Sequence, residues 1–173
     1  MKTLYLLRHA KSDRSGSLED KERPLNRRGR EAAPRIGAAM AARGLSPELV
    51  LVSTSKRTRE TWDLLAPELP RKPLIEHRDD LYLAPAARLL HIVAKIDPSV
   101  GRALILGHNP GLEDLASRLA ASKQPDDGRQ ALERLKTKFP TCGLAVLSFA
   151  VGSWGDVKPG TGELIAFLTP ATG

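Results

Sequence analysis

An α/β fold in three layers, with a mainly parallel sheet flanked by helices, is predicted by two patterns in the sequence. Short apolar runs alternate with segments of helical periodicity over residues 3–139. Such alternation is typical of strand–helix–strand crossovers, which place parallel strands in one sheet and helices on both of its faces. Two further apolar runs near the C-terminus follow each other without a helix between them. We expect this last pair to add an antiparallel edge to the sheet.

The first part of the chain predicts a strand, a loop and a helix. Thr3–Arg8 is an apolar run that ends in a charge, as expected of a buried strand. Asp13–Arg28 is polar and contains glycine and proline, so we expect a loop there. Asn26 is a typical helix cap before Arg27–Arg43, where apolar residues recur at helical spacing. Pro34 lies inside this predicted helix, where it would remove one backbone hydrogen bond.

The middle of the chain predicts two strands, each followed by a helix. Leu49–Val52 is apolar and precedes Lys56–Leu65, whose apolar side chains share one helical face. Leu74–Glu76 is a brief third strand. Pro85–Ile96 has leucine, isoleucine and valine at helical spacing and ends before a proline.

The last part of the chain begins in the same alternation and then changes character. Ala103–Leu106 predicts a strand, and Pro110–Ala121 a helix with proline in its first turn. Arg129–Phe139 is a further expected helix. Leu144–Phe149 and Glu163–Leu168 are the two C-terminal strands, separated by a segment rich in glycine and proline.

Length and composition limit the class of protein. A length of 173 residues fits one domain over residues 1–173. Contents of 41% hydrophobic and 27% charged residues are those of a soluble globular chain rather than a disordered one. The uncharged apolar runs are far shorter than the roughly 20 residues of a membrane span, and the N-terminal run is too short for a secretory signal. We therefore expect a cytoplasmic protein without membrane contact.

The net charge of +7 favours an anionic substrate more than a nucleic acid. The cations are spread from Lys2 to Lys158 rather than clustered. The chain has only 2 Trp, 2 Tyr and 3 Phe, too few for a platform that stacks bases. A positive field instead raises the local concentration of anions and their encounter rate. We expect phosphate-like anions as ligands and no nucleic acid as partner.

Polar side chains follow three of the first four predicted strands. Arg8 and His9 come at the end of the first strand, Arg57 soon after the second, and His108 after the strand at Ala103–Leu106. The carboxyl ends of strands in open α/β sheets are where ligands bind. The helix that begins near Pro110 would point its positive N-terminus toward the same place. Two guanidinium groups and two imidazoles in one pocket predict a binding site for a dianion.

Four segments, in this order along the chain, resemble the motifs of the histidine phosphatase (phosphoglycerate mutase-like) superfamily. Leu7–Ala10 resembles its opening Arg-His-Gly signature, and Pro24–Gly29 is similar to the segment that starts its first helix. Ser53–Thr61 resembles its second-arginine motif, and Leu106–Glu113 the second-histidine motif in the form found in SixA-type phosphohistidine phosphatases. Together the matches span residues 7–113. One departure is alanine in place of the usual glycine at the end of the first motif.

The resemblance implies a role for each matching residue. His9 would be the nucleophile that accepts the phosphoryl group, and Arg8, Arg57 and His108 would bind its oxygens. Asn109, beside the second histidine, is a further predicted substrate-binding residue. A histidine attacks only when neutral, and neighbouring arginines disfavour its cationic form. The resemblance implies no metal and no cofactor, because the guanidinium groups supply the positive charge.

A general acid is harder to find in the sequence. Many superfamily members place a glutamate or aspartate between the second arginine and the second histidine, where it protonates an alkoxide leaving group. Here the candidates are Glu76, Asp79 and Asp80, and none lies in a convincing acid motif. Asp13 and Asp20 are interpreted as solvated loop residues. A phosphohistidine whose imidazole leaves as a neutral group needs little acid, so the sequence favours cleavage of a P–N bond.

The predicted function is therefore removal of phosphate from phosphohistidine on a partner protein, such as a histidine phosphotransfer domain or a phosphocarrier. Two alternatives stay open. One is a small-molecule phosphomonoesterase or sugar-phosphate mutase of the same superfamily, although only residues 120–144 are free to form a lid. The other is a non-catalytic module that binds phosphoproteins.

Several further residues receive structural interpretations. His77 and His91 are expected to be ordinary surface or packing residues, and the spacing of the histidines matches no zinc motif. Cys142 is expected to be a small buried filler, and as the only cysteine it has no internal disulfide partner. Arg23 and Asn26 either line the mouth of the pocket or have structural roles in the loop and the helix cap.

Overall fold

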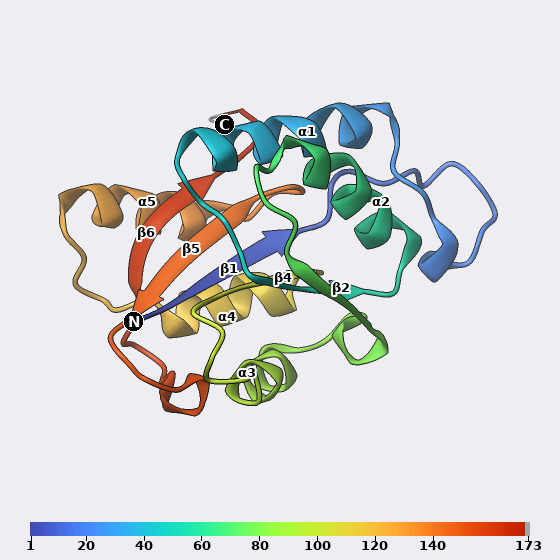
Figure 1. Ribbon diagram of the computed structural model, residues 1–173. Coiled ribbons are helices and arrows are strands. Elements are labelled where there is room, and N and C mark those ends of the chain that lie inside the picture. Colours follow the sequence, from blue (N-terminus) through green and yellow to red (C-terminus); the bar gives the residue numbers. More distant parts are fainter. Residues whose placement is uncertain (172–173) are drawn as a thin grey trace.

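The computed structural model describes residues 1–171, and its six strands form one mixed sheet (Figure 1). The strand order is β3-β2-β4-β1-β5-β6. β1 pairs in parallel with β4, and β2 pairs in parallel with β4 and β3. β5 pairs antiparallel with β1 and β6, which confirms the mainly parallel sheet and its antiparallel edge. The strands are β1 (Lys2–Arg8), β2 (Leu49–Ser53), β3 (Leu74–Arg78), β4 (Arg102–Gly107), β5 (Leu144–Phe149) and β6 (Glu163–Leu168).

Helices cover both faces of the sheet, as the sequence predicts for three layers. In Figure 1, α1 and α2 lie over one face while α3 and α4 lie under the other. α5 joins the layer of α3 and α4 and packs along β6. The α-helices are α1 (Arg27–Ala42), α2 (Lys56–Leu65), α3 (Ala86–Ala94), α4 (Gly111–Leu119) and α5 (Asp126–Thr137).

Three helices, α3, α4 and α5, differ from their predicted boundaries, and α3 is the shorter segment Ala86–Ala94. Pro110 is the N-cap of α4 rather than a residue of its first turn, and the helix ends at Leu119. α5 begins three residues earlier than expected, directly after Pro125, whose fixed φ suits a helix start. α1 continues through Pro34, so the cost of one lost backbone bond is offset by the buried face of the helix.

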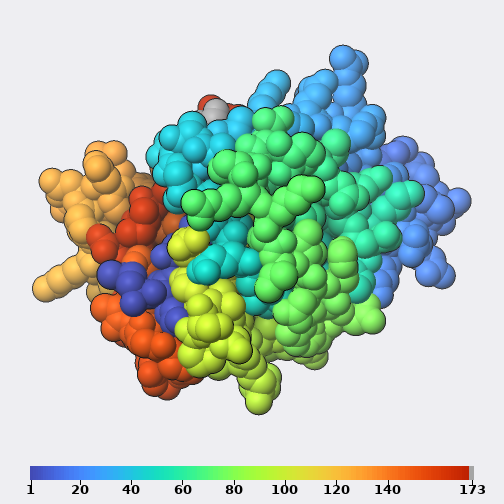
Figure 2. All heavy atoms as spheres, in the orientation of Figure 1, coloured from blue at the N-terminus to red at the C-terminus, as the bar shows by residue number. Residues whose placement is uncertain are grey.

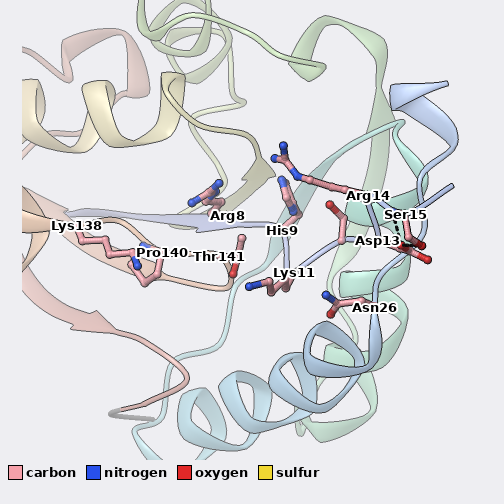
Figure 3. Close-up of a pocket in the computed structure, with 11 residues that line it drawn as sticks. Arg8, His9, Lys11, Asp13, Arg14, Ser15, Asn26, Lys138, Pro140 and Thr141 are labelled. Atoms are coloured by element: carbon pink, nitrogen blue, oxygen red, sulfur yellow. Dashed lines mark hydrogen bonds between the residues drawn. The ribbon is translucent and has the colours of Figure 1, made fainter. Parts of the chain in front are cut away.

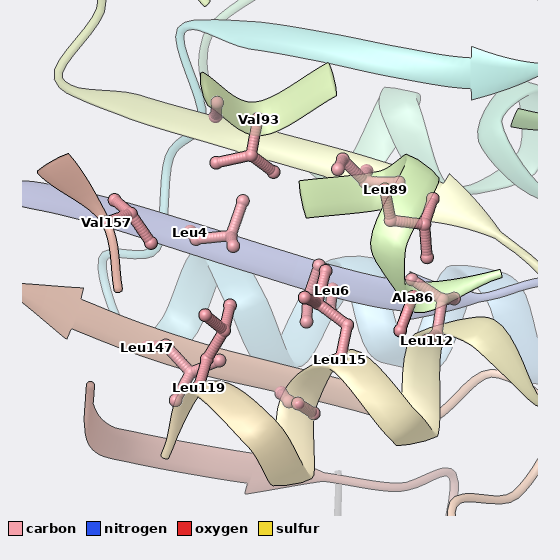
Figure 4. Close-up of a cluster of buried hydrophobic side chains, with 14 of the residues drawn as sticks. Leu4, Leu6, Ala86, Leu89, Val93, Leu112, Leu115, Leu119, Leu147 and Val157 are labelled. Carbon is pink, nitrogen blue, oxygen red and sulfur yellow. The ribbon is translucent and has the colours of Figure 1, made fainter. Parts of the chain in front are cut away.

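The larger apolar core lies between the sheet and the layer of α3, α4 and α5. Figure 4 shows Leu112, Leu115 and Leu119 of α4 pointing toward the β1 residues Leu4 and Leu6. These five leucines are at most 1% exposed. Each buried leucine contributes roughly 1.5–3 kcal/mol relative to an exposed one. The packing fixes α4, and with it the turn that carries His108, against the central strand.

Two glycines let the loops around the carboxyl ends of the strands approach the helices closely. A Cβ at Gly29 in α1 would lie 2.1 Å from the carbonyl oxygen of Lys11, just after β1. A Cβ at Gly111 in α4 would lie 1.9 Å from the carbonyl oxygen of Ala84. Both distances are too short for any side chain. Glycine at these positions therefore brings the loop after β1 and the segment before α3 against the helices that border the site.

Across residues 1–171, no helix is long and apolar enough to span a membrane.

Candidate active site

The predicted reactive residues meet at the carboxyl ends of β1, β2 and β4. Arg8 pairs with Gly107 at the ends of β1 and β4, so the next residues, His9 and His108, lie side by side. Their ring centroids are 5.4 Å apart. Arg57 reaches both rings from the first turn of α2, directly after β2. The structure therefore brings together four of the five predicted site residues in one buried cluster.

The imidazole of His9 is held in one tautomer. Its Nδ1 lies 2.7 Å from the carbonyl oxygen of Ala10, which can only accept, so Nδ1 carries the proton. Nε2 is then unprotonated, and its lone pair accepts from Nε of Arg57 at 3.4 Å. The backbone that follows is fixed too, because the N–H of Ala10 donates to Oγ1 of Thr61 at 2.9 Å. His9 thus presents an unprotonated Nε2 to a guanidinium group.

His108 is held between Ser53 and Arg57. Its Nε2 lies 2.8 Å from Oγ of the buried Ser53, and its Nδ1 lies 3.4 Å from Nη2 of Arg57. Because a guanidinium group only donates, Nδ1 accepts and the proton is on Nε2, which donates to Ser53. The edge of Tyr82 covers the same ring, with 5.4 Å between centroids.

Both histidines are uncharged at neutral pH. Burial lowers the pKa of His9 to about 3; the hydrogen bond to Ala10 opposes this shift, and the positive charges of Arg57 and Arg8 reinforce it. Burial and then Arg57 lower the pKa of His108 to about 3 as well. A neutral imidazole is the form that can attack phosphorus, so the electrostatics agree with a nucleophilic His9.

Arg8 lies beside the histidines with part of its hydrogen-bonding capacity unused. Its Nη1 donates to the carbonyl oxygen of Phe139 at 3.0 Å. Its buried Nε has no hydrogen-bond partner within residues 1–171. Buried polar atoms are nearly always paired in folded proteins, and an orphaned donor is therefore a sign of a bound group. An unpaired guanidinium N–H next to His9 fits an anion site.

Asn109 follows His108 but its side chain already has two protein partners. Nδ2 donates to the carbonyl oxygen of Phe139 at 3.0 Å, and Oδ1 accepts from the N–H of Glu113 at 3.2 Å. The side chain thereby caps α4 and ties it to the segment before β5. A contact between Asn109 and the substrate stays a prediction.

Asp20 is a site residue that the sequence interpretation placed in solvent. Its carboxylate Oδ2 accepts from Nη2 of Arg57 at 3.0 Å and from the hydroxyl of Tyr82. Its Oδ1 accepts from Arg23, with 3.0 Å to Nη2. Burial would raise the pKa of Asp20, but these hydrogen bonds outweigh it and hold the pKa well below its usual range. Asp20 is therefore a carboxylate, bound to the same guanidinium group that a phosphoryl group would use.

A pocket of about 530 Å³ opens beside this cluster. Figure 3 shows Arg8 and His9 at the end of β1, with Lys11, Pro140 and Thr141 beside them. Figure 2 shows the blue segment that follows β1 at the right of the molecule, next to the blue-green atoms of α2. Asp20 of this segment accepts from Arg57 of α2. Of the reactive residues, Arg8 and His9 line this pocket, while Arg57 and His108 are buried behind His9 and contact it from there.

Comparison with known proteins assigns the family. Residues 4–81 match the model of the histidine phosphatase superfamily (branch 1). An uncharacterized protein of Mycobacterium tuberculosis is 34% identical over 164 residues, which cover 95% of this chain and 99% of that one. A solved structure of a proposed phosphohistidine phosphatase SixA from Agrobacterium tumefaciens is 30% identical, with a TM-score of 0.79 and 98% of both chains covered. The chain belongs to the histidine phosphatase superfamily.

The match extends to the SixA-type branch of the superfamily. A second solved structure, of a proposed phosphohistidine phosphatase SixA from Nakamurella multipartitia, has a TM-score of 0.81 at 27% identity. The matched region covers 98% of this chain and 96% of the Nakamurella multipartitia chain. The resemblance inferred from the four sequence motifs is thereby confirmed, and so is the phosphoglycerate mutase-like fold. The family supports a phosphatase.

The three carboxylates that the sequence offered as a general acid lie away from this histidine phosphatase site. Asp79 accepts from Lys21 and Thr54, and Asp80 accepts from Arg78. Glu76 lies in β3, where the strand is exposed. None of the three has a hydrogen bond or ion pair with His9, Arg57 or His108 within residues 1–171. The carboxylate that contacts Arg57, and through it approaches both histidines, is that of Asp20.

Asn26 has both of the roles that the sequence left open, whereas Arg23 has the structural one. Arg23 donates to Asp20 and to Oγ of Ser12, so it fixes the loop that carries the carboxylate. Asn26 accepts from the N–H of Gly29 at 2.9 Å as the N-cap of α1, and it also lines the pocket. No sequence motif marked Asp20, because the contacts that bring it to the site are with Arg57 and Tyr82, which are distant in the sequence.

The remaining predictions about metal and sulfur concern the surroundings of the site. Within residues 1–171 no group of three or more His, Cys, Asp or Glu side chains is placed to hold a metal ion. Cys142 is fully buried, and burial raises the pKa of its thiol to about 12. Its backbone N–H donates to the carbonyl oxygens of Arg8 and His9, so it supports the end of β1.

Proposed function

We propose that this protein removes the phosphoryl group from phosphohistidine on a partner protein, through a phosphohistidine intermediate on His9. The observation that carries the proposal is the state of His9: a neutral ring whose Nδ1 proton is fixed by Ala10 and whose unprotonated Nε2 accepts from Arg57. A surface histidine would be partly protonated and free to rotate. His9 is ready to attack without any prior proton transfer.

In the first step, the lone pair on Nε2 of His9 attacks phosphorus and the P–N bond of the substrate breaks. The electron pair of that bond stays on the leaving imidazole, which departs as a neutral group when its other nitrogen carries a proton. As Arg57 turns its N–H groups from His9 to the phosphoryl group, it and Arg8 donate to the equatorial oxygens, where negative charge is concentrated in the transition state. His108 contributes by donating its Nε2–H to an oxygen in place of Ser53. The guanidinium groups supply the positive charge, so the proposed reaction needs no metal ion.

In the second step, water attacks the phosphorus atom of phosphohistidine at position 9. The P–N bond breaks, inorganic phosphate leaves with the oxygen of the water, and Nε2 regains its lone pair. Splitting one displacement into two lets the same oxygen-binding groups act twice. His9 ends in the neutral state in which it began.

The ionised state of the carboxylate at the site favours a phosphoramidate over a phosphate ester as substrate. An ester leaves as an alkoxide and needs a proton donor. Asp20, the carboxyl group bound to Arg57, is ionised because its hydrogen bonds lower its pKa. A phosphoimidazole with a protonated ring has no such requirement. The open pocket also admits an imidazole that projects from another protein.

The substrate test compares three peptides of the same sequence that carry phosphohistidine, phosphoserine or phosphotyrosine. We expect the phosphohistidine peptide to release phosphate at least about a hundredfold faster than the two ester peptides do. The esters need a proton donor that the site does not supply, whereas the phosphohistidine needs none. Equal rates on all three would contradict the assignment and identify a general phosphomonoesterase.

A trapping experiment separates an enzyme from a module that only binds phosphoproteins. The protein is mixed with ³²P-labelled phosphohistidine peptide and quenched with alkali, in which phosphohistidine survives. We expect label on the wild type and on His91→Ala, whose histidine is exposed on α3, and none on His9→Ala. Absence of label and of phosphate release from wild-type protein would contradict the proposed function.

A further inference from the structure

A second hollow adjoins the pocket that contains His9. It has a volume of about 480 Å³ and shares Lys11, Pro140 and Thr141 with the first. From this shared wall it extends along α1, where Arg28 and Arg35 line it. These two arginines lie two helical turns apart and therefore share one face of the helix. The two hollows form one groove, which we call the α1 groove, with the nucleophile at one end.

The α1 groove is lined by cations that have no acidic partner. Besides Arg8, five cationic side chains line the two hollows, and all five are exposed: Lys11, Arg14, Arg28, Arg35 and Lys138. None of these five forms an ion pair or a side-chain hydrogen bond within residues 1–171. Five unpaired positive charges along one depression make a strong local field for a chain of negative charges.

The two carboxylates that also line the groove do little to neutralise it. Asp13 accepts from the hydroxyl and the backbone N–H of Ser15, and Glu31 pairs with Arg27 on the outer surface of α1. Figure 3 shows the hydrogen bonds between Asp13 and Ser15 at the edge of the first hollow. The groove therefore keeps an excess of positive charge along its whole length.

The lining favours a protein over a nucleic acid. Proteins that hold single strands combine positive charge with aromatic side chains on which the bases stack. Apart from His9, no residue that lines the α1 groove has an aromatic ring. Carboxylates need no such platform, because guanidinium and ammonium groups bind them directly.

We infer that the α1 groove docks an acidic segment of the phosphohistidine-bearing partner protein and so directs its phosphoryl group to His9. This inference rests on the proposed function and adds the surface that selects the partner. Carboxylates near the phosphohistidine lie over Lys11, Arg28 and Arg35 while the phosphoimidazole enters beside Arg8. The pocket at His9 recognises the phosphoryl group, and the groove recognises the protein that carries it.

A binding experiment tests the groove without any catalysis. A fluorescent peptide without phosphate, rich in glutamate, is titrated with wild-type protein, with the double variant Arg28→Glu/Arg35→Glu and with Arg88→Glu/Lys95→Glu. The second pair has the same spacing and charge change, is exposed, and consists of Arg88 in α3 and the C-cap residue Lys95 of that helix, in the opposite layer. We expect binding to weaken about tenfold or more in the first variant, and less than about twofold in the second.

A turnover experiment separates failure of the groove from failure of the proposed function. Two phosphohistidine peptides, one flanked by glutamate and one by glutamine, are compared with phosphoramidate as a small donor. We expect Arg28→Glu/Arg35→Glu to remove the preference for the acidic peptide and to leave phosphoramidate hydrolysis unchanged. Added salt should reduce the wild-type preference in the same way.

Each outcome bears on one of the two claims. Equal binding of the glutamate-rich peptide by all three proteins would overturn the inference that the α1 groove docks an acidic protein segment. Tighter binding of a single-stranded DNA of equal charge would overturn it as well. If the wild type turned over both peptides without a preference for the acidic one, the docking inference would be overturned and the proposed phosphatase function would stand. Binding that depends on Arg28 and Arg35, with no turnover of any phosphoramidate, would support the groove and overturn the proposed function.

Discussion

Asp20 and Arg57 are joined by two contacts: Nη2 of the arginine lies 3.0 Å from the carboxylate, and Nη1 lies 2.7 Å from the carbonyl oxygen of the same aspartate. Arg57 is the cation that touches both His9 and His108. The carboxylate that contacts this guanidinium group is therefore supplied by the chain itself. A phosphoryl dianion has to compete with this carboxylate or share the guanidinium group with it.

The first prediction follows from this competition. In Asp20→Asn the amide keeps the shape of the side chain but loses its charge, so an incoming dianion is no longer repelled. The side chain of Asp20 is 47% exposed, and ion pairs of this kind contribute about 1 kcal/mol or less. We expect the inhibition constant of orthovanadate to fall by up to about fivefold. Inhibition assays on phosphoramidate hydrolysis measure it.

The control for this prediction is Asp126→Asn, which removes an exposed carboxylate paired with Arg129 on α5. It should leave vanadate inhibition unchanged. Weaker inhibition in Asp20→Asn would mean that Asp20 holds Arg57 in position rather than competing with the ligand. A selective loss of ester hydrolysis would identify Asp20 as a proton donor instead.

The second prediction concerns pH. His9 and His108 have pKa values of about 3 in the folded protein, below the ordinary value near 6.5. Between these values the unfolded chain binds more protons than the folded one, so stability falls as pH drops from about 6.5 toward 3. From pH 7 to pH 5 each histidine contributes a loss of up to about 2 kcal/mol.

Two measurements check the pH prediction. NMR signals of the imidazoles of His9 and His108 should not titrate between pH 8 and pH 5. Urea unfolding of the double variant His9→Asn/His108→Asn should lose less stability over that range than wild-type unfolding does. Titration of either ring near pH 6.5 would contradict the burial that lowers these pKa values.

Much of this architecture was accessible from the sequence because it follows from local patterns. Apolar runs such as Leu49–Val52 and the helix Lys56–Leu65 were placed within one residue of the observed bounds. The meeting of His9 with His108 was also predictable, because both follow strands whose carboxyl ends lie at one edge of a parallel sheet.

The role of Asp20 was less accessible, because it depends on how a loop folds back. The segment between β1 and α1 has little regular periodicity, and its path is set by contacts with Tyr82 and Arg57 from distant parts of the chain. The α1 groove is hidden for the same reason: Lys11, Arg28 and Lys138 are far apart in sequence and meet only in the fold.

The third prediction tests the support of the nucleophile by Thr61. Its Oγ1 accepts from the N–H of Ala10 and donates to the carbonyl oxygen of Arg57, so it links the backbones beside His9 and Arg57. Thr61→Val keeps the shape but leaves a buried N–H unpaired, which costs about 1–3 kcal/mol of stability. We expect kcat to fall more than KM changes, because the variant disturbs alignment rather than the charges that bind phosphate.

The matched control is Thr137→Val at the exposed end of α5, where the hydroxyl donates to a backbone carbonyl within the helix. It should retain full activity and nearly full stability. If Thr61→Val lost stability but kept its kcat, Thr61 would have a structural role alone.

The fourth prediction concerns the close approach of α1 to the loop after β1. A Cβ at Gly29 would meet the carbonyl oxygen of Lys11 at 2.1 Å, so Gly29→Ala forces the loop and the helix apart. We expect a loss of stability of about 1–3 kcal/mol, measured by urea unfolding.

The control is Gly152→Ala, which adds the same methyl group where no atom lies within 4 Å, so urea unfolding should show little change. Because Lys11 lines both hollows of the α1 groove, Gly29→Ala should also slow turnover of the acidic phosphohistidine peptide. Equal stability of the two alanine variants would show that the loop moves freely away from α1, and that its path is not fixed by this contact.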